Sequence, residues 1–558
     1  MNSGPISWPA DPVVVVGAGP VGQTAALLLA RWGVPSVVLD QRSERDPIGS
    51  KAICQQRDVL DIWEAAGAGA KIAAEGVTWT TARTFHRDRE LFSYTFVDAG
   101  SSAFPPFVNL SQARTEQVLD ERIAVEPLVT LRWAHRVVDL TQHANGVTVH
   151  CDTPAGPTAL RTPYLLVCTG ARCEELRRLL TVSFDGQSFD DRFLICDIRT
   201  DLPGWASERR FYFDPVWNPG RQVLIHPCPN STFRIDWQVP PDYDLDREEA
   251  SGALDLRIRA IIGDRDYEIV WKSVYRFHSR CVNRMRVGRA LIAGDAAHLV
   301  APFGARGLNS GVADAENAAW KIAYAGHGWA PEELLETYHA ERHTAARENL
   351  EVTTATMDFL VPPDAARARR RVEVLAGAAT DPAVRAQVDS GRLSEPFWYV
   401  ESPLTTTDPS RPFTGRPPRG AAPPAGPGVL VPDAPIRMPG GGPGRFRTLA
   451  RDGFLLLLAA DADPVPTREA AAAARGPVRV LAMSDIDPAG AVSEALRARP
   501  GEVWVIRPDA HVAAVLGAPA TAAVTAALDR ALGRTAVMGE DRTQCHRSTP
   551  APLLETPS

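Results

Sequence analysis

Four consecutive valines, Val13–Val16, run directly into a glycine-rich turn of sequence GAGPVG, and this feature constrains the fold more than any other. A continuous β-branched run is typical of a parallel strand that is buried on both faces. The turn is followed by an apolar helix to about Trp32 and by a second strand, 36–40, that ends in Asp40. This order of strand, turn, helix and strand predicts a dinucleotide-binding α/β unit.

The glycines of this turn and the acid that follows each have a physical role. Gly17 allows a tight turn, Gly19 leaves room for a pyrophosphate against the helix N-terminus, and Gly22 lets the helix pack closely on the strand. Asp40 is placed to accept hydrogen bonds from ribose hydroxyls, and a carboxylate there would repel a 2′-phosphate. Together these parts predict a site for a dinucleotide that lacks a 2′-phosphate.

A second motif lies far along the chain, where the apolar run 290–293 ends in Gly294-Asp295. The chain then passes through a loop that contains Pro302 and enters a helix near Asn309. Such a helix entry points backbone N–H groups at one spot, where they stabilise an anion. Taken alone, the stretch fits a plain strand–helix connection with a capping Asp equally well.

The composition excludes several function classes. The chain has 558 residues, too many for one ordinary core, so about two or three domains are expected. Its net charge of −7, with no long basic run to offset it, argues against a nucleic-acid partner. Residues 1–12 lack the basic segment of a signal peptide, and no apolar span reaches the length of a membrane helix, so no membrane association is expected. The eight cysteines are scattered without metal-ligand or disulfide spacing, so no metal site is predicted and a cytoplasmic location is expected.

Two further regions have recognisable patterns. Residues 192–277 are predicted to form antiparallel strands, and in 232–239 apolar residues alternate with polar ones. The aromatic content of this region suits a flat apolar ligand, although most of these aromatics are interpreted as core. The Pro/Gly-rich segment 403–444 is predicted to be an extended linker without regular structure. Beyond it, apolar runs alternate with Ala-rich segments and predict a small α/β domain, and the polar residues from about Gly539 are expected to be disordered.

In this order, the glycine-rich turn, Asp40, the strand end at Thr169-Gly170 and the GDAAH motif at 294–298 resemble the single-component FAD-dependent aromatic hydroxylases, which have the para-hydroxybenzoate hydroxylase fold. The resemblance covers about residues 13–360. The length and the C-terminal part are similar to the phenol hydroxylase and 3-(3-hydroxyphenyl)propionate hydroxylase branch. Members of that branch carry a C-terminal thioredoxin-like domain without redox cysteines, and this chain has no cysteine in 454–532.

The resemblance implies a mixed α/β (α+β) fold with a Rossmann-like FAD-binding domain, an antiparallel-sheet substrate domain and a C-terminal thioredoxin-like α/β domain. The expected boundaries are 10–185 and 281–402 for the two parts of the FAD-binding domain, the second with a long helix, 186–280 for the substrate-binding sheet, 403–445 for the linker, 446–540 for the thioredoxin-like domain and 541–558 for a tail.

The resemblance also implies roles for individual residues. Asp295 would bind the ribityl chain of FAD, Asp40 would bind the adenosine ribose, and the backbone carbonyl of Pro302 would lie near the flavin C4a atom. The backbone from Gly304 to Asn309 would lie beside the flavin N1/O2 edge, and no metal is implied. The expected FAD-binding residues are Gly17, Gly19, Gly22, Asp40, Arg42, Lys51, Gln112, Gly294, Asp295, Gly307, Leu308 and Asn309.

One motif departs from the family pattern. Members usually have Asp-Gly followed by a small residue and Ser, with an Arg at a fixed distance. This chain has Thr169-Gly170 and then Cys173, and Arg177 lies one residue late. That motif is associated with both FAD and NAD(P)H binding, so the departure bears on the pyridine nucleotide, whereas the other FAD anchors are independent of it.

The implied activity is that of an FAD-dependent monooxygenase. NAD(P)H reduces FAD, the reduced flavin captures O₂, and a C4a-hydroperoxide transfers oxygen to a phenolic or polycyclic aromatic substrate. Arg234 and His226 are candidates for a basic group that deprotonates a phenol, although a structural role is more common for such residues. Two alternatives remain open: Baeyer–Villiger oxidation of a polyketide-like substrate, and a flavin-binding protein that no longer oxidises NAD(P)H, which Thr169 would mark. A homodimer to which the C-terminal domain contributes is a further expectation.

Overall fold

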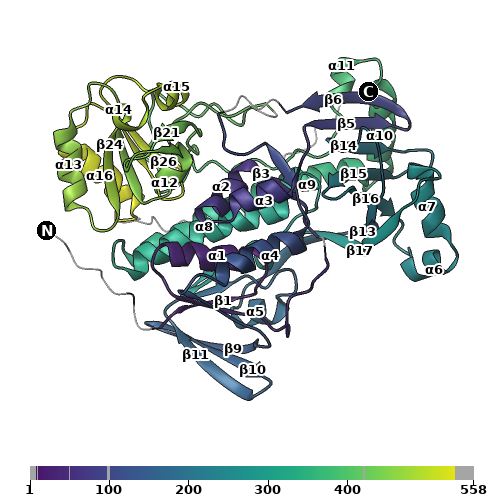
Figure 1. The fold of residues 1–558 in the computed structure, drawn as a ribbon, viewed down its shortest axis with the longest axis horizontal. Helices are drawn as coiled ribbons and strands as arrows, with labels where there is room; N and C mark the ends of the chain where they lie inside the picture. Colours follow the sequence, from purple (N-terminus) through teal and green to yellow (C-terminus); the bar gives the residue numbers. More distant parts are fainter. Residues whose placement is uncertain (1–7, 9–10, 50, 97–100, 419–420, 535–558) are drawn as a thin grey trace, which may run out of the picture.

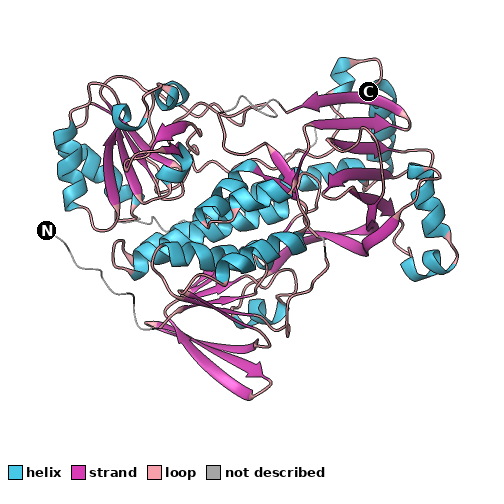
Figure 2. Cartoon of the chain, viewed as in Figure 1, coloured by secondary structure: helices cyan, strands magenta, loops and turns pink. Residues whose placement is uncertain are grey.

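A computed structural model describes residues 8, 11–49, 51–96, 101–418 and 421–534, and the expected tail at 541–558 lies outside this part of the chain. The fold is mixed α/β, as expected, with parallel and antiparallel sheets. The C-terminal unit and a large eight-stranded sheet lie at opposite ends of the molecule, with long helices between them (Figure 1). Figure 2 shows helices around the sheet of the C-terminal unit and long helices beside the strands of the first domain.

The six-stranded sheet at the centre of the first domain has the order β18-β19-β12-β1-β2-β8. Its neighbouring strands are parallel except for the pair β18–β19. All four valines of β1 are buried, as expected for a central strand that is covered on both faces. The strands are β1 (Val13–Val16), β2 (Ser36–Leu39), β8 (Val129–Arg132), β12 (Leu165–Val167), β18 (Arg286–Val287) and β19 (Ala290–Ile292).

Glycines allow the helices of this domain to pack closely. A Cβ atom at Gly22 would lie 2.0 Å from the carbonyl oxygen of Gly17, and one at Gly311 would lie 2.7 Å from a methyl of Val21. Helix α8 begins at Arg306, earlier than the expected start near Asn309. The helices are α1 (Pro20–Arg31), α2 (Arg57–Ala65), α3 (Gly69–Glu75), α4 (Gln112–Ile123), α5 (Glu174–Leu179), α8 (Arg306–Gly326), α9 (Glu336–Leu360), α10 (Ala365–Gly377) and α11 (Pro382–Arg385), with single turns η1 (Gly294–Ala296) and η2 (Glu332–Leu335).

Two three-stranded sheets extend the first domain, with the orders β11-β10-β9 and β3-β7-β4. The second of these fixes the chain just before α2, because β3 pairs with β7 from a segment about fifty residues later. The strands are β3 (Cys54–Gln56), β4 (Val77–Thr78), β7 (Phe107–Asn109), β9 (Arg136–His143), β10 (Gly146–Thr153) and β11 (Gly156–Thr162).

The eight-stranded sheet has the order β20-β17-β13-β16-β15-β14-β5-β6. Its neighbours are antiparallel, as expected, except that β5 runs parallel to β14. Strands β5 and β6 come from residues 81–95, so the N-terminal part of the chain also contributes to this sheet. The elements are β5 (Thr81–His86), β6 (Arg89–Thr95), β13 (Phe184–Arg199), β14 (Glu208–Phe213), β15 (Gln222–Cys228), β16 (Thr232–Val239), β17 (Glu268–Val282) and β20 (His298–Leu299), with helices α6 (Leu245–Ala250) and α7 (Ala253–Ile262).

The C-terminal unit is built on a four-stranded sheet of order β24-β23-β25-β26. Strands β23 and β24 are parallel, and the pairs β23–β25 and β25–β26 are antiparallel, which is the thioredoxin-like arrangement that the resemblance implied. The elements are α12 (Phe446–Ala450), β23 (Phe454–Leu458), α13 (Pro464–Ala473), β24 (Val478–Ala482), α14 (Met483–Ile486), α15 (Ala491–Leu496), β25 (Glu502–Ile506), β26 (Val512–Gly517) and α16 (Thr521–Ala531).

The Pro/Gly-rich segment does contain regular structure, so the expectation of none was wrong for its last part. Strands β21 (Pro435–Arg437) and β22 (Pro443–Arg445) form a two-stranded antiparallel sheet. Gly441 and Gly442 connect them with φ angles of +87° and +83°. Glycine adopts such angles without strain, so the glycine run that argued against regular structure in fact supplies the turn.

The described residues contain neither a candidate membrane span nor a candidate metal site. In this part of the chain, no helix is long and apolar enough to cross a membrane. Nor do its His, Cys, Asp and Glu side chains form a group of three or more that could hold a metal ion. Seven cysteines, all in residues 54–281, are free thiols.

Candidate cofactor site

The glycine-rich turn leaves the N-terminus of α1 open. Gly19 is the N-cap residue, no side chain caps the helix, and a Cβ atom at Gly19 would meet no atom within 4 Å. Gly17 adopts a φ of +109°, which favours glycine, and a Cβ there would lie 2.3 Å from the carbonyl oxygen of Cys168. Helix amides without partners are donors for an anion, so this turn fits a pyrophosphate.

Asp40 and Arg42 lie beside this turn and contact each other. The carboxylate of Asp40 accepts hydrogen bonds from the backbone N–H of Ala18 at 2.9 Å and of Arg42 at 2.9 Å, and the Arg42 guanidinium lies 3.0 Å away. Burial opposes ionisation of Asp40, but the hydrogen bonds from Arg42 and Ala18 outweigh it, and the pKa of Asp40 is lowered. Asp40 is therefore an anion held rigidly at the end of β2, whereas Arg42 has its charge largely engaged by Asp40.

Asp295 is the exposed residue of an otherwise buried loop. It follows Gly294, whose φ is +61°, and lies in the single turn η1 after β19. Its side chain is accessible to solvent. The surrounding protein nevertheless desolvates the carboxyl group and raises the pKa of Asp295, and the positive charges of His298, Lys51 and Arg177 only partly oppose this shift. A carboxyl group that is both accessible and surrounded by protein is expected on the wall of a narrow hollow.

Two buried side chains hold the backbone of this loop. The N–H of Gly294 donates a hydrogen bond to the carboxylate of Asp314 on α8 at 2.9 Å. From the other side, Arg177 donates from Nε to the carbonyl oxygen of Ala296 at 2.9 Å and from Nη2 to that of Asp295 at 3.3 Å. Because both neighbours of the Asp295 side chain are fixed through the backbone, its carboxylate is aimed before any ligand binds.

The departing motif lies next to this loop. Within the described residues the buried Thr169 hydroxyl has no hydrogen-bond partner, and burial raises the pKa of the nearby Cys173 thiol. Cys173 is the N-cap residue of α5, so Arg177 is carried on the helix that this motif starts. The one-residue displacement of Arg177 does not separate it from Asp295, because its guanidinium still contacts the Asp295 loop.

The start of α8 brings Gly307 next to Asp295, and the expected residues Leu308 and Asn309 follow it in the helix. A Cβ atom at Gly307 would lie 3.9 Å from a carboxylate oxygen of Asp295, and Leu308 follows in the first turn. No side chain caps this helix, so its first amides are donors for a ligand edge. The side chain of Asn309 instead bonds to the backbone of β3, with Oδ1 accepting from Gln56 N–H and Nδ2 donating to the Cys54 carbonyl, both at 3.0 Å.

Lys51 and Gln112 border the same region. Gln112 accepts a hydrogen bond from the backbone N–H of Ala52 at 3.2 Å, which ties α4 to the segment after β2. Lys51 is exposed, and its charge is close enough to Asp295 to favour the ionised carboxylate. The structure thus brings the second glycine motif, Lys51 and Gln112 into one region.

Arg234 occupies the polar face of β16, and that face is buried as well. Its guanidinium forms an ion pair with Asp197 at 2.8 Å and donates to the backbone carbonyl of Lys51 at 3.1 Å. Only 2% of Arg234 is exposed, and the neighbouring charge of Asp197 outweighs burial, so its pKa is raised. A guanidinium in this state holds its proton, so its contacts make Arg234 a tie between the sheet and the cofactor domain rather than a base.

The loop after Asp295 packs on the same face of the sheet. In the strand register, Phe193 lies opposite Gln238 and Phe211 opposite Leu224, which places both on the face of Arg234. The ring of Phe303 lies 5.4 Å from that of Phe193 and 6.2 Å from that of Phe211. Pro302, one residue earlier, is exposed.

Two further polar groups occupy this face without partners. Within the described residues, Oδ1 of Asp236 and Nδ1 of His226 have no hydrogen-bond partner. Burial raises the pKa of Asp236 to about 7, with the charge of Arg234 opposing the shift, although the side chain is partly accessible. Burial and the charge of Arg209 place the pKa of His226 well below its usual value, so His226 is neutral.

Sequence reasoning missed Asp314, which holds the Asp295 loop, and Asp236. Asp314 lies in a helix where an acid reads as a surface residue, yet it is fully buried. Asp236 alternates with apolar residues on a strand, a pattern that predicts a solvated face. The alternation of polar and apolar residues in this strand does place Asp236 on the face opposite the core. The sequence does not reveal, however, that this polar face is itself buried.

The described residues fit FAD at each point that can be tested. The α1 terminus is open at Gly19, Asp40 is an anion at the end of β2, the Asp295 side chain is exposed beside the start of α8, and the amides at the start of α8 lack a capping side chain. These are sites for a pyrophosphate, a ribose, a ribityl chain and the polar edge of a ring, respectively.

Comparisons with known proteins agree with this site. A family model described as "FAD binding domain" matches residues 11–353, and one described as "Aromatic-ring hydroxylase, C-terminal" matches residues 425–535. A 3-(3-hydroxy-phenyl)propionate/3-hydroxycinnamic acid hydroxylase from Mycobacterium sp. (strain KMS) is 29% identical over 377 residues, 67% of this chain and 64% of the relative. The matched stretch therefore spans just under two thirds of that relative's length.

Two other similar proteins extend the comparison. A flavin-dependent monooxygenase from Mycobacteroides abscessus is 31% identical over 366 residues, 61% of this chain and 73% of the relative. The crystal structure of the flavin-dependent monooxygenase PieE in complex with FAD and substrate has a TM-score of 0.80 and 24% identity, covers 94% of this chain and 99% of that one, and shows the shared fold. Because the first family model matches more than half of the chain, this protein belongs to the FAD binding domain family, and its C-terminal part matches that of the aromatic-ring hydroxylases.

Proposed function

We propose that this chain is an FAD-dependent monooxygenase that uses NAD(P)H and O₂ to hydroxylate a phenolic or polycyclic aromatic substrate. The observation that carries the proposal is the contact between the Phe303 loop and the aromatic and polar face of the eight-stranded sheet. That loop follows the Asp295 site along the chain, so an aromatic ring held against this face would lie next to the cofactor. Rings of Phe193, Phe211 and Phe303 supply flat apolar walls.

The residues that would hold FAD follow from the site. The α1 terminus at Gly19 would take the pyrophosphate, Asp40 the adenosine ribose and Asp295 the ribityl chain. The amides at Gly307 and Leu308 would stabilise negative charge at the polar edge of the ring. Bound FAD would supply the redox chemistry, accepting a hydride from NAD(P)H and activating O₂.

Asp236 is the group that we assign to the phenolic proton. Its pKa of about 7 makes it a carboxylate near neutral pH that is still basic enough to accept a proton. An ionised phenol has a more electron-rich ring, which favours transfer of an oxygen atom to it. The positive charges of Arg234 and Arg209 lie close enough to Asp236 to favour its anion, and they would favour a phenolate at the same place.

Exclusion of water is the second task of these residues. Phe193 and Phe211 are buried, Phe303 is 3% exposed, and together they cover the sheet beside the cofactor site. An apolar wall of this kind would keep water from the activated oxygen and so limit its loss as hydrogen peroxide.

Rapid-reaction measurements on the purified FAD complex test the proposal. NADH or NADPH, with a panel of phenols and polycyclic aromatics present, is expected to bleach the oxidised flavin, and reaction in ¹⁸O₂ is expected to give a ring hydroxyl that carries the label. Absence of bleaching by either nucleotide with every compound would leave a flavin-binding protein instead of a monooxygenase. Labelled lactone in place of a labelled hydroxyl would assign Baeyer–Villiger chemistry.

The quaternary structure and location belong to the same proposal. We infer a homodimer to which the C-terminal unit contributes, and sedimentation velocity of the full chain tests it, because a monomer at every concentration would contradict the dimer. A reducing cytoplasm is supported by the free thiols at seven described cysteines, six of which are buried.

A further inference from the structure

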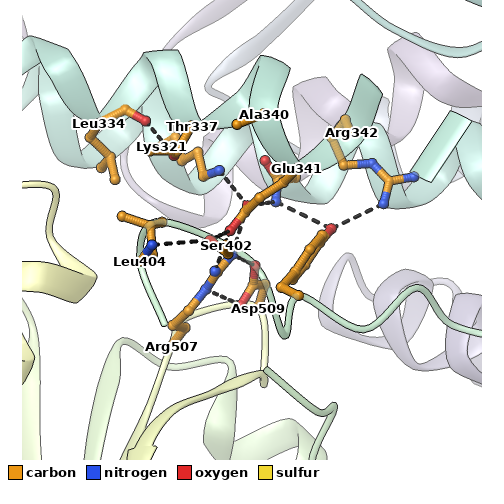
Figure 3. Close-up of polar contacts among 12 residues, drawn as sticks. Lys321, Leu334, Thr337, Ala340, Glu341, Arg342, Ser402, Leu404, Arg507 and Asp509 are labelled. Atoms are coloured by element: carbon orange, nitrogen blue, oxygen red, sulfur yellow. Dashed lines mark hydrogen bonds and ion pairs between the residues drawn. The ribbon is translucent and has the colours of Figure 1, made fainter. Parts of the chain in front are cut away.

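A cluster of buried charges joins the C-terminal unit to the long helices of the first domain (Figure 3). Glu341 on α9 accepts from Arg507 at 2.5 Å and 3.0 Å and from Lys321 on α8 at 2.6 Å. Arg507 also pairs with Asp509 at 2.6 Å, and Ser402 donates to Glu341 at 2.5 Å. The side chains of Lys321, Glu341 and Arg507 are 0% exposed, so this cluster is sealed from solvent.

A second buried cluster holds the cofactor loop. Arg342, the neighbour of Glu341 on α9, forms an ion pair with Asp314 at 2.7 Å and donates to the backbone carbonyl of Ser310 at 3.2 Å. Asp314 in turn accepts from the N–H of Gly294 at 2.9 Å and lies 2.7 Å from His298. The position of Gly294, and with it that of Asp295, depends on where Arg342 and Asp314 lie.

The hydroxyl of Tyr399 joins the two clusters. It accepts from Nη1 of Arg342 at 3.0 Å and from Nδ2 of Asn317 at 3.3 Å, and Asn317 also donates to Glu341 at 2.8 Å. The Tyr399 ring packs against His511 and Arg507, with Arg507 5.0 Å from the ring centre. Burial raises the pKa of Tyr399 well above its usual value, so its hydroxyl stays neutral beside these charges.

The physics of buried charge makes such a connection rigid. Three cations (Lys321, Arg342 and Arg507) are matched by three anions (Asp314, Glu341 and Asp509). Each charge is costly to bury without its partner, so the network has few alternative arrangements. The position of each residue in it therefore fixes the position of its partner. Arg507 and Asp509 belong to the C-terminal unit, whereas Asp314 contacts the cofactor loop.

We propose that Tyr399 is a positioning residue for FAD, through which the C-terminal unit fixes the Gly294–Asp295 loop. The inference rests on the proposed FAD site at Asp295. It gives the thioredoxin-like unit, which has no redox cysteines, a function inside its own chain. Tyr399 acts through Arg342 and Asp314 and is not itself placed at the flavin.

Tyr399→Phe in the full chain tests this inference, because it removes one hydroxyl and leaves every charge paired. The matched control is Tyr324→Phe. Tyr324 is also buried, and its hydroxyl donates to the Pro477 carbonyl of the same C-terminal unit at 3.2 Å, outside both clusters. The variants are compared by FAD fluorescence titration of the apoprotein, by thermal unfolding, and by amide hydrogen exchange of the peptide 290–299.

We expect Tyr399→Phe to raise the Kd for FAD about fivefold, the net effect of one ordinary hydrogen bond, and to speed exchange at the Gly294 amide. The two variants are expected to lower the Tm by similar amounts, but Tyr324→Phe is expected to leave the Kd for FAD within about twofold of the wild-type value. Equal Kd values for the two variants, or faster exchange with an unchanged Kd, would overturn the inference. If wild type and Asp295→Ala bound FAD with the same affinity, the proposed FAD site itself would be overturned. The failure of this inference and the failure of the proposed site are therefore distinguishable.

Discussion

Nε of Arg177 donates a hydrogen bond to the backbone carbonyl oxygen of Ala296 at 2.9 Å, across 119 residues of sequence. This contact places the displaced arginine of the departing motif at the back of the Asp295 loop. Leu176, which occupies the position where an arginine was expected, is buried in the core. The Arg177 guanidinium also packs over the ring of Phe184, 3.6 Å from the ring centre.

Arg177→Gln is expected to weaken FAD binding because two carbonyl groups of the loop lose their donor. The loss of hydrogen bonds from a charged group predicts a Kd about tenfold higher. Fluorescence titration of the apoprotein measures it, and Arg178→Gln, at an exposed neighbouring position on α5, is the matched control. An unchanged Kd in Arg177→Gln would show that the loop is held well enough by Asp314 alone.

Asp295→Ala is expected to give a folded protein without bound yellow flavin. Absorbance of the purified protein at the flavin bands measures the occupancy, and Asp88→Ala, in an exposed turn, is the control. The pKa of Asp295 is raised in the fold, so its carboxylate destabilises the apoprotein as the pH rises above the unfolded value. The apoprotein of Asp295→Ala is therefore expected to melt no lower than wild type at neutral pH. Full FAD occupancy in the variant would contradict the site.

Asp236→Asn is expected to remove a pH dependence. If Asp236 accepts the phenolic proton, kcat of the wild type rises with pH as its carboxyl, of pKa about 7, ionises, whereas the variant is slow and lacks this step. The sign for stability is opposite, because a raised pKa means that wild type loses stability between the unfolded value of 3.8 and about 7, relative to Asp236→Asn. Steady-state rates and Tm across this range measure both, with the exposed Asp190→Asn as control. A rate profile shared by wild type and Asp236→Asn would remove Asp236 from the chemistry.

Arg447→Met is expected to lower the free energy of unfolding by about 3–5 kcal/mol, because it leaves buried carboxylates unpaired. Arg447 of the C-terminal unit pairs with Asp58 and, at 2.7 Å, with Asp61 on α2. Arg114→Met is the comparison, since Arg114 pairs with Glu75 near the surface and its loss is expected to cost less than about 1 kcal/mol. Urea unfolding measures the free energy of unfolding of both variants. Similar decreases for the two would show that water reaches the ion pairs of Arg447.

Much of the cofactor site could be predicted because its signals are local. The turn from Gly17 to Gly22 and the acid at Asp40 lie within thirty residues, and backbone sterics alone demand glycine where φ is positive or a Cβ would clash. The Gly294–Asp295 motif is local in the same sense, with a strand, a tight turn and a helix entry in sequence order. Apolar runs that alternate with Ala-rich segments also predicted a small C-terminal α/β domain, and the resemblance implied its thioredoxin-like arrangement.

The sequence by itself therefore determined the dinucleotide fingerprint, the second glycine motif and the three-part architecture. Only the tertiary structure decided which side chains hold the Asp295 loop, that β5 and β6 join the large sheet, and that Tyr399 links two charge clusters. The physical reason is range. Helix and strand periods and glycine angles are set within a few turns of chain, whereas the partner of a buried charge is decided by packing, as when Arg507 meets Glu341 across 166 residues.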